Sequence, residues 1–281
     1  MPVLKPPDLA LAEIAVAAVL IAATPPIFES LLRRSACVAR NFRGDTIPQS
    51  FGLAILFEAT ILLGIDARFG MGWRRDVIWL VTVTAFSALG LLDDVAGDRQ
   101  VKGLRGHLMA LIHGRRVTTG LLKAAGGLAV AALAACLIRP GRPLEIGLAA
   151  TVIALSANAM NLLDLRPGRA CAAFSLCAIP LCAVAVHNQP GRVPELAFVL
   201  LPALTVWPRD AFAKVMLGDA GSNLLGAAVG LAIAEYLAPW QQAVCLAVLV
   251  ALHATAERVS LTEVIERVPA LRALDRLTGV R

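Results

Sequence analysis

Residues 77–94 read VIWLVTVTAFSALGLLDD, an uncharged apolar stretch that ends in two adjacent aspartates. Similar stretches recur along the chain, with only short polar segments between them. A membrane-spanning helix needs about 20 mainly apolar residues. No linker or change in composition divides the chain, so we predict a single domain that covers residues 1–281. It contains about nine spans, near 9–31, 50–65, 77–92, 117–138, 146–163, 170–187, 195–208, 222–238 and 241–256.

The composition also indicates a membrane protein. Hydrophobic residues make up 58% of the 281 residues and charged residues 16%, and the mean hydropathy is +0.73. Soluble domains contain about 45–50% apolar residues, so a single water-soluble domain, a disordered chain and a nucleic-acid binder are excluded. One tyrosine and nine phenylalanines argue against a transmembrane barrel, which needs aromatic girdles. We therefore predict an all-α, polytopic transmembrane helical bundle.

The net charge of +6 predicts how the bundle is oriented. Lysine and arginine favour the cytoplasmic loops of membrane proteins. With the N-terminus outside, 18 of the 26 basic residues fall on the cytoplasmic side and seven on the outer side. We expect a multi-pass protein of the cell (plasma or inner) membrane with N-out, C-in topology.

The segment after Ser260 differs from the predicted spans. Its apolar residues approximate one face of a helix, and arginines interleave on the other side; the apolar positions are Leu261, Val264, Ile265, Val268, Leu271 and Leu274. This pattern predicts a C-terminal interfacial amphipathic helix on the inner membrane surface, bent at Pro269. A docked globular end is the alternative.

Three clusters combine carboxylates with glycine or amides at the ends of apolar spans. They are Gly90–Asp98, Asn158–Asp164 and Gly218–Ser222. The predicted topology places all three on the cytoplasmic side. A carboxylate at a membrane boundary costs free energy unless it is hydrated, paired or bound to a cation. We therefore expect the three clusters to form one polar site.

Carboxylates beside basic residues are typical of a Mg²⁺–phosphate site, because Mg²⁺ takes one or two carboxylates and fills its shell with phosphate and water oxygens. Asp219 precedes a Gly-Ser turn that opens a helix, where free backbone N–H groups favour an anion. The remaining phosphate charge would be held by basic residues of the inner loops. The candidates are Lys102, Arg105 and Arg43.

Four motifs, in order along most of the chain, resemble the polyprenyl-phosphate N-acetylhexosamine-1-phosphate transferase superfamily. This superfamily includes phospho-N-acetylmuramoyl-pentapeptide transferase and UDP-GlcNAc:undecaprenyl-phosphate GlcNAc-1-phosphate transferase. The matching segments are Asn41–Gly52, Leu89–Leu104, Asn158–Asp164 and Met216–Ser222. Four motifs in order, together with N-out topology, are a more specific signal than any one of them.

The resemblance implies transfer of a sugar-1-phosphate from a UDP-sugar to a polyprenyl phosphate such as undecaprenyl phosphate. UMP would leave at the cytoplasmic face, and the product would serve cell-envelope glycan synthesis. The implied catalytic residues are Asp93, Asp94, Asp164 and Asp219, with Mg²⁺ held by Asp219. The family often dimerises, so a homodimer is also an expectation.

The resemblance also implies individual roles. Asp93 or Asp94 would position or deprotonate the lipid phosphate, and an aspartate that attacks first to give a covalent intermediate is the alternative. Asn158, Asn161 and Asp164, which lie along one helical face, would line the nucleotide side, and Lys102 would contact phosphate. Independently of the resemblance, Lys123 lies inside an apolar stretch, so its side chain would either extend to the membrane surface or touch the lipid phosphate.

The chain departs from the family pattern in three places. Pro167 stands where the second motif has another aspartate, and Met109 replaces a frequent lysine. Only His253 lies near the place of a histidine-rich last loop, and there is no room for a tenth span. These departures predict a donor specificity of its own.

Two other functions stay open at this point. One is a catalytically altered relative that binds the lipid carrier or partner proteins. The other is a cation-coupled transporter, although transporters place their ion-binding residues near the membrane midplane, whereas these acids lie at span ends.

Overall fold

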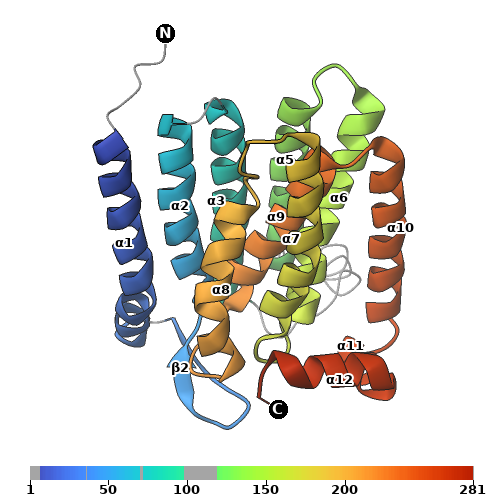
Figure 1. Cartoon of the computed structure of the whole chain (residues 1–281). Helices are drawn as coiled ribbons and strands as arrows, with labels where there is room; N and C mark the ends of the chain where they lie inside the picture. Colours follow the sequence, from blue (N-terminus) through green and yellow to red (C-terminus); the bar gives the residue numbers. More distant parts are fainter. Residues whose placement is uncertain (1–6, 36, 70–71, 98–118, 281) are drawn as a thin grey trace.

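The structure is a computed structural model, and it describes residues 7–35, 37–69, 72–97 and 119–280. Within these residues, nine long helices lie side by side in a bundle (Figure 1). They are α1 (Pro7–Arg33), α2 (Gly52–Phe69), α3 (Trp73–Ala96), α5 (Thr119–Ile138), α6 (Pro143–Leu163), α7 (Arg169–Asn188), α8 (Ala197–Ala211), α9 (Gly218–Tyr236) and α10 (Pro239–Ala256). The predicted helical bundle is confirmed.

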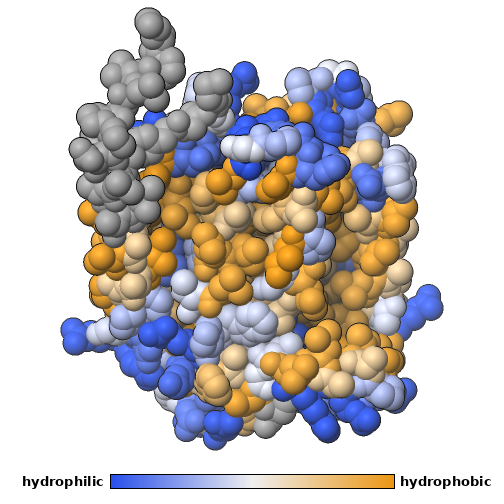
Figure 2. Space-filling model, in the orientation of Figure 1, coloured by the Kyte–Doolittle hydropathy of each residue, from blue (hydrophilic) through white to orange (hydrophobic). Residues whose placement is uncertain are grey.

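Six helices of the described part are long and apolar enough to cross a membrane: α1, α3, α5, α6, α7 and α10. Figure 2 shows an apolar band across the middle of one face of the molecule and hydrophilic side chains toward both ends of that face. The protein is therefore a multi-pass membrane protein. In the same described residues α2, α8 and α9 do not meet that criterion, and α8 has only 15 residues. Nine spans and the N-out orientation stay predictions.

Helix α9 forms the centre of the bundle. Sixteen of its nineteen residues are buried, and it packs against α3 and α6. Nine of its nineteen residues are glycine or alanine, which allow backbones to approach closely where helices pack within a membrane. A helix that is apolar on all sides is expected to be buried in a core, and α9 is buried in the core of this bundle.

A short antiparallel hairpin follows α1, formed by β1 (Val38–Arg40) and β2 (Thr46–Pro48). The side chain of Asn41 closes its turn by accepting hydrogen bonds from the N–H groups of Arg43 and Asp45, both at 2.9 Å. The hairpin continues into the segment before α9: Met216 N–H donates to Pro48 O (2.8 Å) and Phe51 N–H to Met216 O (3.0 Å). The first loop is thereby fixed against the start of α9.

Two short helices, α11 (Leu261–Arg267) and α12 (Pro269–Thr278), lie across one end of the bundle (Figure 1). The predicted bend at Pro269 is confirmed. The C-terminal segment is docked on the bundle and still exposes an apolar face, visible over α12 in Figure 2; that face carries Val268, Leu271, Leu274 and Leu277. Its position at the membrane surface stays a prediction.

Candidate active site

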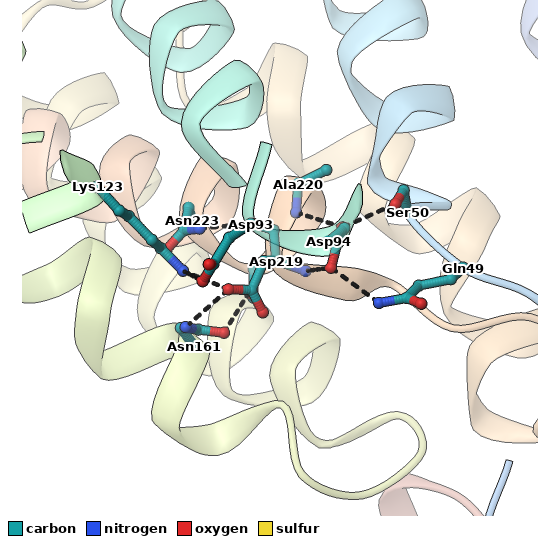
Figure 3. A network of polar contacts seen from close by, with 10 residues as sticks. Gln49, Ser50, Asp93, Asp94, Lys123, Asn161, Asp219, Ala220 and Asn223 are labelled. Carbon is teal, nitrogen blue, oxygen red and sulfur yellow. Dashed lines mark hydrogen bonds and ion pairs between the residues drawn. The ribbon is translucent and has the colours of Figure 1, made fainter. Parts of the chain in front are cut away.

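Three helix ends meet at one end of the bundle, which we call the acidic end. Asp93 and Asp94 lie in the last turn of α3, Asn161 lies near the end of α6 with Asp164 directly after it, and Asp219 lies in the first turn of α9. Figure 3 shows the side chains of Asp93, Asp94, Asn161 and Asp219 in one polar network. The three sequence clusters therefore form one site.

Asp94 anchors the first turn of α9. One carboxylate oxygen, Oδ1, accepts from Gln49 Nε2 (2.9 Å) and from the backbone N–H of Asp219 (3.0 Å). The other, Oδ2, accepts from Ser50 Oγ (2.7 Å) and from the N–H of Ala220 (3.1 Å). A carboxylate is favoured at a helix N-terminus because it satisfies free N–H groups and faces the positive end of the helix dipole. Four donors surround Asp94, so it positions Asp219.

Two glycines permit this arrangement. Gly90 of α3 lies against the backbone carbonyl of Asp219, so that a Cβ atom at Gly90 would collide with it. Gly218 has φ +73°, and a Cβ atom there would lie 2.7 Å from Asp94 Oδ2. Only glycine adopts this backbone conformation without strain. The G-D sequence at the start of α9 is therefore what brings Asp219 to the end of α3.

Lys123 of α5 joins Asp93 and Asp219. Its Nζ lies 3.4 Å from Asp93 Oδ2 and forms an ion pair with Asp219 Oδ2. The exposed fractions are 16% for the Lys123 side chain, 25% for Asp93 and 28% for Asp219. These three groups are thus sheltered by the bundle and still accessible to a ligand. Two carboxylates share one ammonium group, which leaves one net negative charge.

Amide and hydroxyl groups support this ion pair from the other side. Nδ2 of Asn161 donates to Asp219 Oδ1 (2.9 Å) and Ser222 Oγ (3.1 Å), and its Oδ1 accepts from Lys123 Nζ (3.0 Å). The amide orientation is the one that satisfies these donors and acceptors. Asn223 Nδ2 donates to the Asp219 carbonyl (2.7 Å). Asp219 is therefore held at its side chain and at its backbone.

Two further carboxyl groups, those of Asp164 and Asp210, lie close to the network. Asp164 is the C-cap residue of α6. Burial raises the pKa of its carboxyl well above its usual range, and the neighbouring carboxylates of Asp210, Asp219 and Asp94 raise this pKa further. Asp210, buried at the end of α8, accepts hydrogen bonds from the N–H groups of Gly168 (2.8 Å) and Leu217 (3.4 Å).

The structure gathers some of the predicted site residues and not others. Asp93, Asp94, Asn161 and Asp219 are joined by hydrogen bonds and ion pairs, and Asp164 is their neighbour. Two further predicted residues lie apart from this network. Asn158 is exposed one turn before Asn161, and Arg43 is exposed in the hairpin turn with its guanidinium 5.1 Å from the centre of the Phe42 ring. Lys102 and Arg105 lie outside the described residues.

Several contacts that the structure places in the site were not predicted from the sequence. Gln49 and Ser50 fall inside the first motif, between residues 41 and 52, so their position was a usable signal. Asp210 ends an apolar run as the other aspartates do, but no glycine or amide accompanies it. Lys123 was predicted to extend to the membrane surface or to touch the lipid phosphate, but its pairing with Asp93 and Asp219 was not predicted. Its place between Asp93 and Asp219 depends on how α5 packs against α3.

The donor set fits a cation that completes its shell with ligand oxygens. In the described part of the chain, no group of three or more His, Cys, Asp or Glu side chains is arranged to hold a metal ion. Mg²⁺ needs no such group, since one or two carboxylates suffice when phosphate and water supply the other oxygens. Asp93 and Asp219 already share a cation in the form of Lys123. These two carboxylates are therefore suited to Mg²⁺.

Comparison with known proteins adds one match. A family model described as glycosyl transferase family 4 matches residues 77–236. The match starts in α3 and ends with α9, and so covers more than half of the chain and all three acidic clusters. No curated protein matches the chain significantly.

Proposed function

Because this chain belongs to glycosyl transferase family 4, the polyprenyl-phosphate hexosamine-1-phosphate transferase family, we propose that it transfers a sugar-1-phosphate from a UDP-sugar to a polyprenyl phosphate. The reaction takes place at the cytoplasmic face of the cell membrane, depends on Mg²⁺ and releases UMP. The lipid-linked sugar that forms serves cell-envelope glycan synthesis. The observation that carries this proposal is the Asp93–Lys123–Asp219 ion-pair network at the start of α9.

The charge of this network suits two phosphate substrates. With Lys123 between them, the carboxylates of Asp93 and Asp219 carry one net negative charge. A divalent cation held by Asp219, alone or with Asp93, would make the net charge of the network positive. Mg²⁺ held by Asp219, alone or with Asp93, would neutralise charge on the pyrophosphate and on the phosphate that leaves. Lys123 Nζ, released from Asp219, then contacts phosphate oxygens. A lysine ammonium is a compact charge on a flexible side chain, so Lys123 is able to move from Asp219 to the phosphate.

The bond changes follow from the substrates. An oxygen of the lipid phosphate attacks the phosphorus that carries the sugar, and the bond from this phosphorus to the bridging oxygen breaks. UMP leaves with the bridging oxygen, and a polyprenyl diphosphate sugar forms. Asp93 holds the lipid phosphate or accepts its proton, because Asp93 faces Lys123 whereas both oxygens of Asp94 are occupied by donors. Asp94 keeps Asp219 in place.

Asn161 and Asp164 lie on the α6 side of the network and line the nucleotide side in this proposal. Asn161 fixes the orientation of the Asp219 carboxylate. Burial, together with the neighbouring carboxylates, raises the pKa of Asp164, so its carboxyl group is suited to hydrogen bonds with the donor. Polyprenyl phosphate and the UDP-sugar are the partners, and the homodimer stays a prediction.

An aspartate that attacks first, forming a covalent sugar-phosphate intermediate, is the alternative route. It makes a separate prediction, because UMP would then leave before the lipid arrives. Labelled UMP would exchange into the UDP-sugar in the absence of polyprenyl phosphate if the intermediate forms. A direct attack by the lipid phosphate gives no exchange until the lipid is added.

The proposal is tested by a donor screen. Purified protein is incubated with undecaprenyl phosphate, Mg²⁺ and each of a broad panel of UDP-sugars, and the lipid product is identified by mass spectrometry. We expect a polyprenyl diphosphate sugar and an equal amount of UMP with at least one donor, and neither with Asp219→Ala. The absence of product with every donor of the panel contradicts the proposed transfer reaction. Lipid binding without turnover would then indicate a binding protein of the same fold.

A further inference from the structure

A buried ion pair joins the C-terminal helices α11 and α12 to the bundle. Arg169, the first residue of α7, donates from Nε to Asp275 Oδ1 (2.7 Å) and from Nη2 to Asp275 Oδ2 (3.2 Å). Its Nη1 donates to Thr262 Oγ in α11 (3.1 Å). The exposed fractions of the Arg169 and Asp275 side chains are 5% and 10%. A two-pronged arginine–carboxylate pair of this kind fixes orientation as well as distance.

The backbone at the end of α12 and directly after it also packs against the acidic end. Trp207 Nε1 donates to Thr278 O (3.0 Å), and the N–H of Val280 donates to Ala211 O (2.8 Å). Gly168, with φ +75°, lies so close to Thr278 O that a Cβ atom would collide with it. The loop between α6 and α7 and the end of the chain therefore have complementary shapes.

The same loop is connected to Asp219. The Gly168 N–H donates to Asp210 Oδ2, and Asp210 Oδ1 accepts from the N–H of Leu217, the residue before Gly218 and Asp219. Hydrogen bonds and consecutive residues thus connect Asp275 to Asp219 through Arg169, Gly168 and Asp210. The connection is buried at Arg169 and at Asp210.

We propose that Arg169 is a positioning residue, and that its ion pair with Asp275 uses α11 and α12 to hold the loop of residues 164–168 for the nucleotide part of the donor. The inference rests on the proposed function. Arg169 touches no substrate; it acts through the loop and through Asp164, which lies on the donor side of the site. Loss of the ion pair therefore weakens donor binding and leaves the binding of the lipid phosphate, on the Asp93 side, as it is.

The test compares Arg169→Gln, Asp275→Asn and the double variant with the wild-type enzyme. Each single variant is expected to raise the KM for the UDP-sugar about tenfold, with the KM for undecaprenyl phosphate within about twofold. The double variant should resemble the single variants, because both remove one shared interaction. Arg169→Lys, which keeps the charge and loses the two-pronged geometry, should lie between wild type and Arg169→Gln.

Glu263→Gln is the matched control, because it removes an exposed ion pair with Arg267 within α11 and leaves Arg169 untouched. Hydrogen–deuterium exchange over residues 269–280 reports docking independently of activity. It should be faster in the Arg169 and Asp275 variants and unchanged in the control. Unchanged donor KM in both single variants overturns the inference. The inference is also overturned if the variants lose activity toward both substrates equally and in proportion to the fraction of unfolded protein.

Failure of the proposed function has a different signature, which is a wild-type protein that turns over no donor. UDP binding to the same detergent-purified variants, measured by thermal shift, then decides the inference. We expect binding about tenfold weaker than in wild type for each single variant. Equal UDP binding by all variants, or no binding by wild type, overturns the inference.

Discussion

The carboxylate of Asp94, at the end of α3, accepts a hydrogen bond from the backbone N–H of Asp219, with 3.0 Å between Oδ1 and N. Its neighbour Asp93 instead faces the ammonium group of Lys123. Adjacent residues at a helix end point in different directions, so the two aspartates have separate roles. Asp94 builds the site, and Asp93 is available to a substrate.

Asp94→Asn and Asp93→Asn should therefore differ in stability. An asparagine at position 94 would direct its amide N–H₂ group at groups that are themselves hydrogen-bond donors. Buried donors would then be unpaired, which lowers the free energy of unfolding by about 1–3 kcal/mol. We expect Asp94→Asn to lower both the melting temperature and kcat. Asp93→Asn should lower kcat at least about a hundredfold with little change in melting temperature. Thermal unfolding and initial rates on the same detergent-purified samples measure both.

Ser50→Ala serves as a control for the stability arm, because it removes one of the four donors to Asp94 and no charge. It should lower the melting temperature less than Asp94→Asn does. Equal stability of the two aspartate variants would contradict the separate roles.

Lys123→Met removes the cation that Asp93 and Asp219 share. We expect kcat/KM to fall at least about a hundredfold, because a positive charge that contacts phosphate is lost. The Mg²⁺ concentration needed for half-maximal Mg²⁺ binding should not rise, since the carboxylates no longer have a competing ammonium group. Binding of Mn²⁺ in place of Mg²⁺, followed by electron paramagnetic resonance, checks this without turnover. Weaker Mn²⁺ binding would show that Lys123 supports the metal site instead of competing for it.

The helices were predictable where apolar runs end in polar residues. The predicted spans 146–163 and 170–187 correspond to α6 (Pro143–Leu163) and α7 (Arg169–Asn188) within three residues. The hairpin of Val38–Pro48 was not predicted, because its strands are three residues long and its other backbone partner is Met216. A pairing between segments so distant in sequence leaves no local periodicity.

The site was predictable to the extent that its residues belong to motifs. Asp93, Asp94, Asn161 and Asp219 occur beside glycines or amides at span ends, and the structure brings them together. Lys123 and Asp210 have no such neighbours, and their contacts arise only when α5 packs beside α3 and α8 ends beside α9. The division of roles between Asp93 and Asp94 also depends on direction in space, which spacing alone does not give.

Removal of divalent cations should abolish turnover. We expect no product in the presence of EDTA and full recovery on addition of Mg²⁺, because two anionic phosphates meet beside two carboxylates. Asp219→Asn should require at least about tenfold more Mg²⁺ for half-maximal activity, whereas Asp45→Asn, an exposed change in the hairpin turn, should require the same amount as wild type. Activity that survives EDTA would argue against a metal-dependent reaction.

The orientation of the bundle is testable with cysteines at its two ends. Leu144, at the start of α6, is 91% exposed and lies at the end opposite to the acidic end. Glu266 is exposed in α11, across the acidic end. In a background without the six native cysteines, a membrane-impermeant maleimide applied to intact cells should label Leu144→Cys and spare Glu266→Cys. Glu266→Cys should be labelled only after the membrane is permeabilised, because the excess of basic residues on its side predicts a cytoplasmic location. The reverse pattern would place Asp219 outside the cell, where a cytoplasmic UDP-sugar does not reach it, and would contradict both the N-out topology and the proposed donor.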